Sequence, residues 1–264
     1  MADKPVTIAQ IQEMKNRGEK ISMVTGYDYP FARLLDQSGI DMILVGDSVG
    51  VVVAGYPNTL PVTVDEMIYH GKAVMRGNSR ALVVIDMPFM SYQISIEDAK
   101  RQAGRIMQET GATAVKLEGG ISMAATIEAL VTIGIPVLAH IGLTPQAVNQ
   151  LGGFRVQREK ERLLADAKAV TDAGAFGLVI ECVPADIAAE ITSSVNIPTI
   201  GIGAGPTCDG QVLVLHDLLG LFDRFRPSFV KQYANLGPEI IKALQQYHQE
   251  VKDGSFPTEK HSFH

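Results

Sequence analysis

The sequence predicts an α/β fold, a (β/α)8 TIM barrel that forms a single domain over residues 1–264. The length of 264 residues suits one barrel of this kind. Short apolar runs rich in β-branched residues recur along the chain, and each is followed by a stretch with helical periodicity. Eight such runs without an added domain favour a closed barrel over an open, doubly wound sheet, which is the main alternative.

The expected strands each end in glycine or a polar residue. In chain order they are Ile21 to Thr25, Met42 to Gly46, Ala81 to Asp86, Ala114 to Glu118, Pro136 to His140, Gly177 to Glu181, Thr199 to Gly203 and Val212 to Leu215. Thr63 with Glu66 forms a capping box, and Ser95 with Asp98 a weaker one, so helices are expected to begin there. Left-handed glycines are expected at three helix ends, Gly111, Gly134 and Gly174.

Beyond about Asp217 the chain continues into an expected helix around Glu239 to Val251 and a polar tail. This segment would either cap the barrel or contact another subunit.

Composition excludes several classes of protein. A formal net charge of -6 without any Lys/Arg block argues against a nucleic-acid partner. The polar N-terminus does not match a secretory signal, and no apolar run reaches the roughly 20 residues of a membrane span, so a cytoplasmic protein is expected. Two cysteines, Cys182 and Cys208, are too few for a disulfide framework or a zinc site, which fits a reducing compartment.

Acidic residues end several of the expected strands. They are Asp47, Asp86, Glu118 and Glu181. In a barrel the carboxyl ends of all strands share one face, where active sites lie, so these side chains are expected to converge on one pocket. Such a residue can also simply cap the next helix, and for any single one this is about as good an explanation. Four acids at equivalent positions make that explanation much weaker.

These carboxylates could meet around a cation. Hard oxygen donors without His or Cys favour Mg2+ over zinc. Lys116 precedes Glu118 by two residues and points the same way along its strand, so it would add a positive charge beside a bound anion.

Two further residues are weaker candidates. Ser48 could hydrogen-bond a substrate carboxylate or could cap a helix. His140 ends the fifth strand and could donate to a substrate oxygen, although a lone histidine is more often a core residue. Cys182 follows Glu181, and we expect a buried, inert thiol. The run Gly201 to Gly205 lacks the spacing of a dinucleotide fingerprint and suits anion binding or close packing at the seventh strand.

Several segments together resemble the ketopantoate hydroxymethyltransferase family of the phosphoenolpyruvate/pyruvate barrel superfamily, and the resemblance covers nearly the whole chain. The segments are Thr25-Gly26-Tyr27-Asp28, Gly46-Asp47-Ser48-Val49-Gly50, Thr59-Leu60-Pro61-Val62-Thr63, Asp86-Met87-Pro88-Phe89, Val115-Lys116-Leu117-Glu118-Gly119-Gly120, His140-Ile141-Gly142-Leu143-Thr144-Pro145-Gln146, Glu181-Cys182-Val183-Pro184 and Gly201-Ile202-Gly203-Ala204-Gly205. Their combination and order are highly specific.

The resemblance implies a role for each candidate. Mg2+ would be surrounded by Asp47, Asp86 and Glu118, while Ser48 and Lys116 would hold the 2-oxo acid 3-methyl-2-oxobutanoate. It further implies that 5,10-methylenetetrahydrofolate is the one-carbon donor, that 2-dehydropantoate is the product in pantothenate biosynthesis, and that the chain forms a homo-oligomer, a decamer.

Glu181 would be the proton acceptor in that reaction. Negative charge developing on the ketone oxygen would be stabilised by the metal as C3 loses its proton to this residue, and the enolate would attack the methylene carbon of the folate.

One segment departs from the family pattern. After Gln157 the family usually continues with Gly and a longer polar loop, whereas Arg158-Glu159-Lys160 follows here at once. A lid-like role for this loop is therefore in doubt, while the metal and substrate residues are unaffected.

Two alternatives stay open at this point. A related Mg2+-dependent lyase acting on another 2-oxo acid would share the metal residues, but it would be expected to carry a reactive cysteine motif on a mobile loop, and neither cysteine lies in such a motif. A non-catalytic metabolite-binding barrel would need neither the metal acids nor a base, so their joint presence argues against it.

Overall fold

The structure is a computed structural model that describes residues 4–263. The chain divides into two compact units, the first ending at Val214 and the second beginning at Leu215. The eight strands all belong to the first unit. The expectation of one domain over residues 1–264 stays a prediction.

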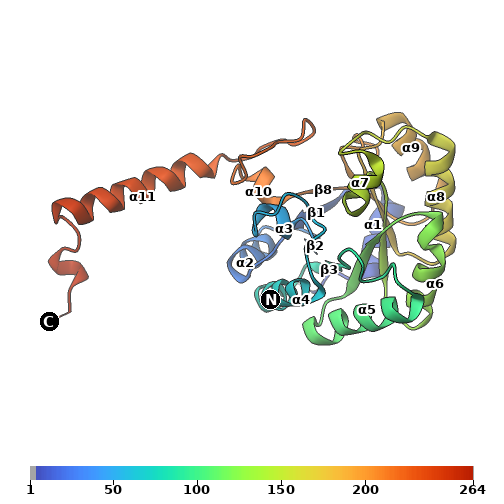
Figure 1. Cartoon of the computed structure of the whole chain (residues 1–264), viewed down its shortest axis with the longest axis horizontal. Helices are drawn as coiled ribbons and strands as arrows, with labels where there is room; N and C mark the ends of the chain where they lie inside the picture. The colour runs from blue at the N-terminus through green and yellow to red at the C-terminus, as the bar shows by residue number, and fades with distance from the viewer. Residues whose placement is uncertain (1–3, 264) are drawn as a thin grey trace. The chain divides into compact units, whose positions relative to one another are not determined.

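The first unit is a closed, parallel barrel in which neighbouring strands follow chain order. The last strand pairs with the first, with Ile21 opposite Gly210, so the sheet has no edge and the doubly wound alternative is wrong. Figure 1 shows the strands at the centre of this unit. The strands are β1 (Ile21–Thr25), β2 (Met42–Val45), β3 (Leu82–Asp86), β4 (Ala114–Glu118), β5 (Val137–Gly142), β6 (Gly177–Glu181), β7 (Thr199–Ile202) and β8 (Gly210–Leu213).

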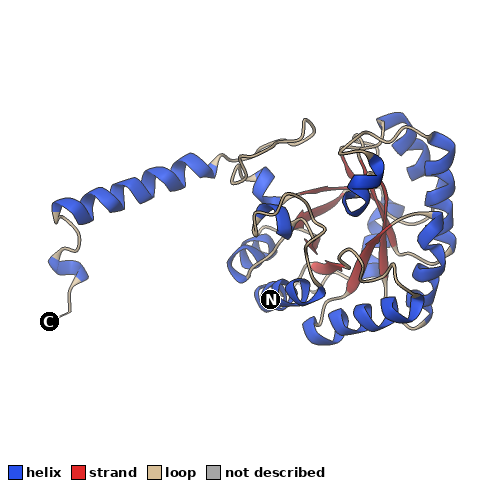
Figure 2. Ribbon diagram, in the orientation of Figure 1, coloured by secondary structure: helices blue, strands red, loops and turns tan. Residues whose placement is uncertain are grey.

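Helices surround these strands, as Figure 2 shows for the first unit. They are α1 (Ile8–Arg17), α2 (Tyr29–Gln37), α3 (Val49–Val52), α4 (Val64–Gly77), α5 (Ile96–Thr110), α6 (Ala124–Thr132), α7 (Val148–Leu151), α8 (Lys160–Asp172) and α9 (Ala185–Ser194), with 3-10 turns η1 (Ile121–Met123) and η2 (Pro145–Ala147). Both halves of the expected capping box are present at Thr63 and Glu66. Ser95 caps α5 by accepting from the Asp98 N–H, and Gly111 ends that helix with φ 75°.

The strand boundaries differ most at the eighth strand, which begins at Gly210 rather than Val212. Gly210 pairs with both neighbouring strands, and a Cβ atom at this position would lie 2.5 Å from the Ile21 carbonyl oxygen. Only glycine permits such a close approach of the two backbones. Gly210 is therefore part of β8, although glycine has a low propensity for strands. The fifth strand continues past His140 to Gly142.

Apolar side chains fill the barrel. The central cluster takes Ile21 and Met23 from β1, Met42 from β2, Leu138 from β5 and Ile200 from β7, all at most 1 % exposed. Strands that are buried on both faces read as continuous apolar runs, which is why they could be located in the sequence.

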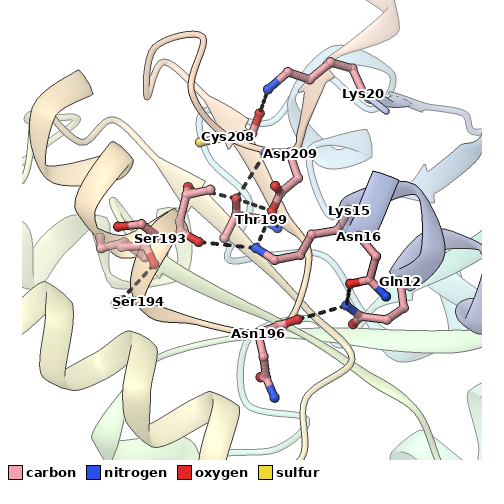
Figure 3. Close-up of polar contacts among 12 residues, drawn as sticks. Gln12, Lys15, Asn16, Lys20, Ser193, Ser194, Asn196, Thr199, Cys208 and Asp209 are labelled. Carbon is pink, nitrogen blue, oxygen red and sulfur yellow. Dashed lines mark hydrogen bonds and ion pairs between the residues drawn. The ribbon is translucent and has the colours of Figure 1, made fainter. Parts of the chain in front are cut away.

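The N-terminal end of the barrel is closed by α1. Ile11 of this helix belongs to the central cluster. Side chains of the same helix also make polar contacts with residues near β7 and β8 (Figure 3). Lys15 Nζ lies 2.8 Å from Asp209 Oδ2, which also accepts from the backbone N–H of Thr199 at 2.8 Å. Gln12 Nε2 donates to the Asn196 carbonyl at 2.9 Å. Because α1 covers the N-terminal end of the barrel, a ligand is expected to enter at the C-terminal end of the strands.

The second unit contains α10 (Leu215–Leu218), α11 (Leu236–Asp253) and the 3-10 turn η3 (Glu259–His261). Helix α11 covers the expected range of Glu239 to Val251 and extends beyond it at both ends. Over residues 4–263 no helix is long and apolar enough to cross a membrane.

Candidate active site

The predicted acids lie together at the C-terminal end of the barrel. Asp86, Glu118 and Glu181 are the last residues of β3, β4 and β6. Asp47 follows the end of β2. The strand register places Lys116 beside Asp86 and His140 beside Glu118. The sequence therefore located these side chains correctly on one face.

Lys116 places an ammonium group among these acids. Its Nζ lies 2.9 Å from Asp86 Oδ1, and both side chains are about as buried as the core. Burial lowers the pKa of the ammonium, but Asp86, Glu118 and Asp47 together raise it above its ordinary value. Lys116 is therefore charged, and it compensates one of the surrounding carboxylates.

Asp47 is placed unfavourably for its ionised form. Burial, followed by repulsion from Asp86 and Glu118, raises its pKa from 3.8 to about 8. Its backbone N–H donates to Asp86 Oδ2 at 3.0 Å, which brings the two residues together. Burial also raises the pKa of Asp86 despite the attraction of Lys116. A cation bound beside Asp47 and Asp86 would favour the ionised forms of both carboxylates.

His140 connects the two glutamates. Its Nδ1 lies 3.5 Å from Glu118 Oε1, and its Nε2 lies 3.2 Å from Glu181 Oε2. Burial and Lys116 lower the pKa of the imidazole, but Glu118 and Glu181 outweigh them and raise it to about 9. The Nε2 atom is buried without a well-aligned hydrogen bond in the described chain. Glu118 and Glu181 therefore favour the charged form of His140, which Lys116 Nζ, 3.4 Å from Nδ1, opposes.

Ser48 faces Tyr27. Its Oγ lies 2.8 Å from the Tyr27 hydroxyl. Ser48 also stands at the start of the short helix α3, but its side chain makes no capping hydrogen bond there. The helix-cap explanation for this serine is therefore wrong as far as its hydroxyl is concerned.

Gln146, in η2, is a site residue to which the sequence assigned no role. Its backbone N–H donates to Glu118 Oε2 at 2.9 Å, and its side-chain Nε2 donates to Asp47 Oδ2 at 2.9 Å. It is 7 % exposed. The only sequence signal was its place at the end of the segment His140 to Gln146 that carries the family resemblance, and nothing in that segment indicated the contact with Asp47.

Backbone geometry holds Glu181 in place. Gly142, with φ 95°, lies against its carbonyl oxygen, which a Cβ atom at this position would overlap. Cys182, the next residue, has φ 50°, an uncommon value for a residue with a side chain. Burial and Glu181 raise the pKa of its thiol to about 12, which disfavours the reactive thiolate. The expected burial is wrong, because the residue is only half-buried.

The glycine-rich run Gly201 to Gly205 packs closely against its neighbours, which is one of the two roles expected for it. A Cβ atom on Gly205 would lie 2.5 Å from Ala185 Cβ.

The segment that departs from the family pattern runs directly from Gln157 into α8. The Gln157 N–H donates to the Cys182 carbonyl at 2.8 Å.

The chemistry of the donors fits a hard divalent cation. Asp86 Oδ1 is buried and has no hydrogen-bond partner in the described residues, apart from its ion pair with Lys116. Carboxylate oxygens are the preferred ligands of Mg2+. Within residues 4–263, however, no three Asp, Glu, His or Cys side chains are grouped closely enough to hold an ion together. The site therefore fits an ion that is bound by fewer than three of these side chains. Binding of Mg2+ by all of Asp47, Asp86 and Glu118 stays a prediction.

Comparison with known proteins identifies the family of this chain. The family model described as ketopantoate hydroxymethyltransferase matches residues 5–259. The chain belongs to this family. The protein is therefore an enzyme, a hydroxymethyltransferase, as the resemblance implied.

Curated members of the family are similar over almost their whole length. The 3-methyl-2-oxobutanoate hydroxymethyltransferase of Moorella thermoacetica is 62% identical over 98% of this chain and 97% of its own. The protein of the same name from Geotalea daltonii is 60% identical over 98% of this chain and 99% of its own.

Solved structures share the barrel at low identity. A phosphonopyruvate hydrolase complexed with oxalate and Mg++ superimposes with a TM-score of 0.63 at 12% identity, covering 96% of this chain and 92% of that one. A 2,3-dimethylmalate lyase of the PEP mutase/isocitrate lyase superfamily gives 0.61 at 16%, covering 97% and 91%. These likenesses concern the fold alone.

Proposed function

We propose that the enzyme transfers a hydroxymethyl group from 5,10-methylenetetrahydrofolate to 3-methyl-2-oxobutanoate and forms 2-dehydropantoate, a step of pantothenate biosynthesis. The observation that carries the proposal is the 62% identity with a curated enzyme named for this substrate over 98% of the chain. The buried cluster of Lys116, His140 and four carboxylates supports it, because acidic and basic groups are both present where a carbon acid would be deprotonated.

Mg2+ would be held chiefly by Asp47 and Asp86. Glu118 would act from farther away, since its Oε2 accepts from the Gln146 N–H and its Oε1 faces His140. When bound, the ion would supply positive charge near the ketone oxygen of the substrate, where negative charge develops as C3 loses its proton. The raised pKa values of Asp47 and Asp86 are consistent with this role, because added positive charge favours their ionised forms.

The remaining residues would hold and deprotonate the substrate. Lys116 and Ser48 would bind the 2-oxo acid, Lys116 through its charge and Ser48 through its hydroxyl. His140 would donate to a substrate oxygen. Glu181 would accept the proton from C3, and it suits this role because it is the least buried of the four carboxylates, with a side chain that is 16% exposed.

The carbanion that remains at C3 would then attack the methylene carbon of the folate. A C–C bond forms, the C–N bonds to that carbon break, and water supplies the oxygen of the new hydroxymethyl group. The two nitrogens freed on tetrahydrofolate take up two protons, one from that water and one from C3 by way of Glu181.

The direct test is to incubate the purified enzyme with both substrates and Mg2+ and to look for 2-dehydropantoate. Formation that stops when the metal is chelated is the expected result. Product formation at the full rate in excess chelator would refute the metal requirement, and no product with any divalent metal would favour a binding barrel. Asp86→Ala should abolish turnover or weaken the Mg2+ dependence while the fold persists.

The base is tested by following exchange of the C3 proton with solvent deuterium, without the folate. Glu181→Gln should slow this exchange by about 100-fold or more, because general bases contribute on the order of 100- to 10000-fold. Glu190→Gln is a matched control, since Glu190 pairs with Lys160 at the surface. Exchange by Glu181→Gln at the rate of the unchanged enzyme would show that another group removes the proton.

Two further features belong to the proposal. The family resemblance implies a homodecamer, and a cytoplasmic location suits the absence of a spanning helix from residues 4–263. Neither lyase chemistry on another 2-oxo acid nor ligand binding alone is favoured by a specific contact of the described site.

A further inference from the structure

Gln146 makes more polar contacts with the active-site acids than its place in a loop would suggest. Its Nε2 donates to Asp47 Oδ2 at 2.9 Å and to the Met87 carbonyl at 3.0 Å. Its Oε1 accepts from the Tyr92 hydroxyl at 2.7 Å and from Gln93 Nε2 at 3.2 Å. The two donor and two acceptor positions of the amide are all used.

These partners fix which way the amide points. The Met87 carbonyl can only accept, so the NH2 group of Gln146 must face it and therefore also faces Asp47. The Tyr92 hydroxyl holds the opposite end of the amide. A network in which every member is satisfied is rigid, so Gln146 presents a donor to Asp47 in one orientation.

The backbone of the same residue fixes a second acid. The Gln146 N–H donates to Glu118 Oε2 at 2.9 Å, and the Tyr92 hydroxyl accepts from the Glu118 N–H at 3.1 Å. Gln146 thus contacts one oxygen of Asp47 and one oxygen of Glu118, whose other oxygen faces His140.

We propose that Gln146 is a positioning residue that sets the orientation of Asp47, which would bind the divalent cation, and of Glu118, which would act on the cation from farther away. The inference rests on the proposed function, because it assumes that these carboxylates act on a cation. Outer partners that orient metal-binding side chains typically contribute 10- to 100-fold to metal affinity or activity.

The test is the affinity of the full-length enzyme for Mn2+, measured by the paramagnetic resonance signal of the free ion in the presence of 3-methyl-2-oxobutanoate. Gln146→Met keeps the length and burial of the side chain but removes its donors. We expect its dissociation constant for Mn2+ to rise about 10- to 100-fold. We also expect kcat to recover to within a few-fold at saturating metal, which a merely structural role would not produce.

Gln157→Met is the matched control, because it makes the same change at a glutamine whose side chain donates to the Arg155 carbonyl instead of to an acid of the site. Its Mn2+ affinity should equal that of the unchanged enzyme. Tyr92→Phe removes the hydroxyl that orients the amide, and Gln146→Asn shortens it. Both variants should also raise the dissociation constant for Mn2+. They test the positioning role if Gln146→Met fails to fold.

An Mn2+ affinity within twofold of the unchanged enzyme in the folded Gln146 variants would overturn the positioning role while leaving the proposed function intact. Failure of the unchanged enzyme to bind Mn2+ would instead overturn the proposed metal site, and the positioning role with it.

Discussion

Replacing Asp47 by asparagine should stabilise the metal-free protein while destroying its activity. In the folded state burial, and then Asp86 and Glu118, hold the pKa of Asp47 at about 8 instead of 3.8. Ionising this side chain is therefore costly in the folded protein and free in the unfolded chain. Asparagine keeps an oxygen that can accept from Gln146 and carries no charge.

The size of the effect follows from the two pKa values. Each pH unit between them corresponds to ~1.4 kcal/mol, so the whole interval from 3.8 to about 8 corresponds to roughly 6 kcal/mol. Because the folded pKa of this acid is raised, the unfolded state binds fewer protons above pH 4, and stability falls as pH rises from about 4 to about 8. The advantage of Asp47→Asn should therefore be roughly 1–2 kcal/mol at pH 5 and approach roughly 5 kcal/mol at pH 8.

The measurement is urea unfolding in excess chelator at pH 5 and pH 8. Asp36→Asn is a control of opposite sign. Burial raises the pKa of Asp36, but hydrogen bonds from Ser79 and from the Arg80 and Ala81 N–H groups outweigh it and lower the pKa. Loss of this carboxylate should destabilise the protein near neutral pH, and less so in acid. An Asp47→Asn variant that is less stable than the unchanged protein at pH 8, or whose advantage does not grow with pH, would refute the reasoning.

Three more changes test other parts of the structure. Lys116→Met should destabilise the metal-free fold by about 3–5 kcal/mol in thermal unfolding, because it leaves the buried Asp86 carboxylate unpaired; a change below about 1 kcal/mol would mean that the pair contributes little. Gly142→Ala should lower both stability and C3-proton exchange, because its Cβ would displace the Glu181 carbonyl, and unchanged exchange would contradict this. Thr63→Ala should cost about 1 kcal/mol through loss of the α4 cap with kcat unchanged, and a reduced kcat would indicate that α4 influences the site.

Much of the fold could be predicted because its signals are local. Strands buried on both faces give continuous apolar runs, and β1, β4 and β6 have the predicted bounds. The eighth strand was placed too late, because close contacts from β1 and β7 require the glycine that begins it, and those contacts come from distant parts of the chain.

The sequence by itself determined the barrel and the set of acids at its C-terminal end, because strand ends can be read from the chain and a closed barrel places all of them on one face. Only the tertiary structure decided how these groups interact. The contact between Gln146 and Asp47 joins residues 99 positions apart, and His140 lies between Glu118 and Glu181 from neighbouring strands. The raised pKa of Asp47 likewise depends on burial and on charges from other strands, which no local pattern carries.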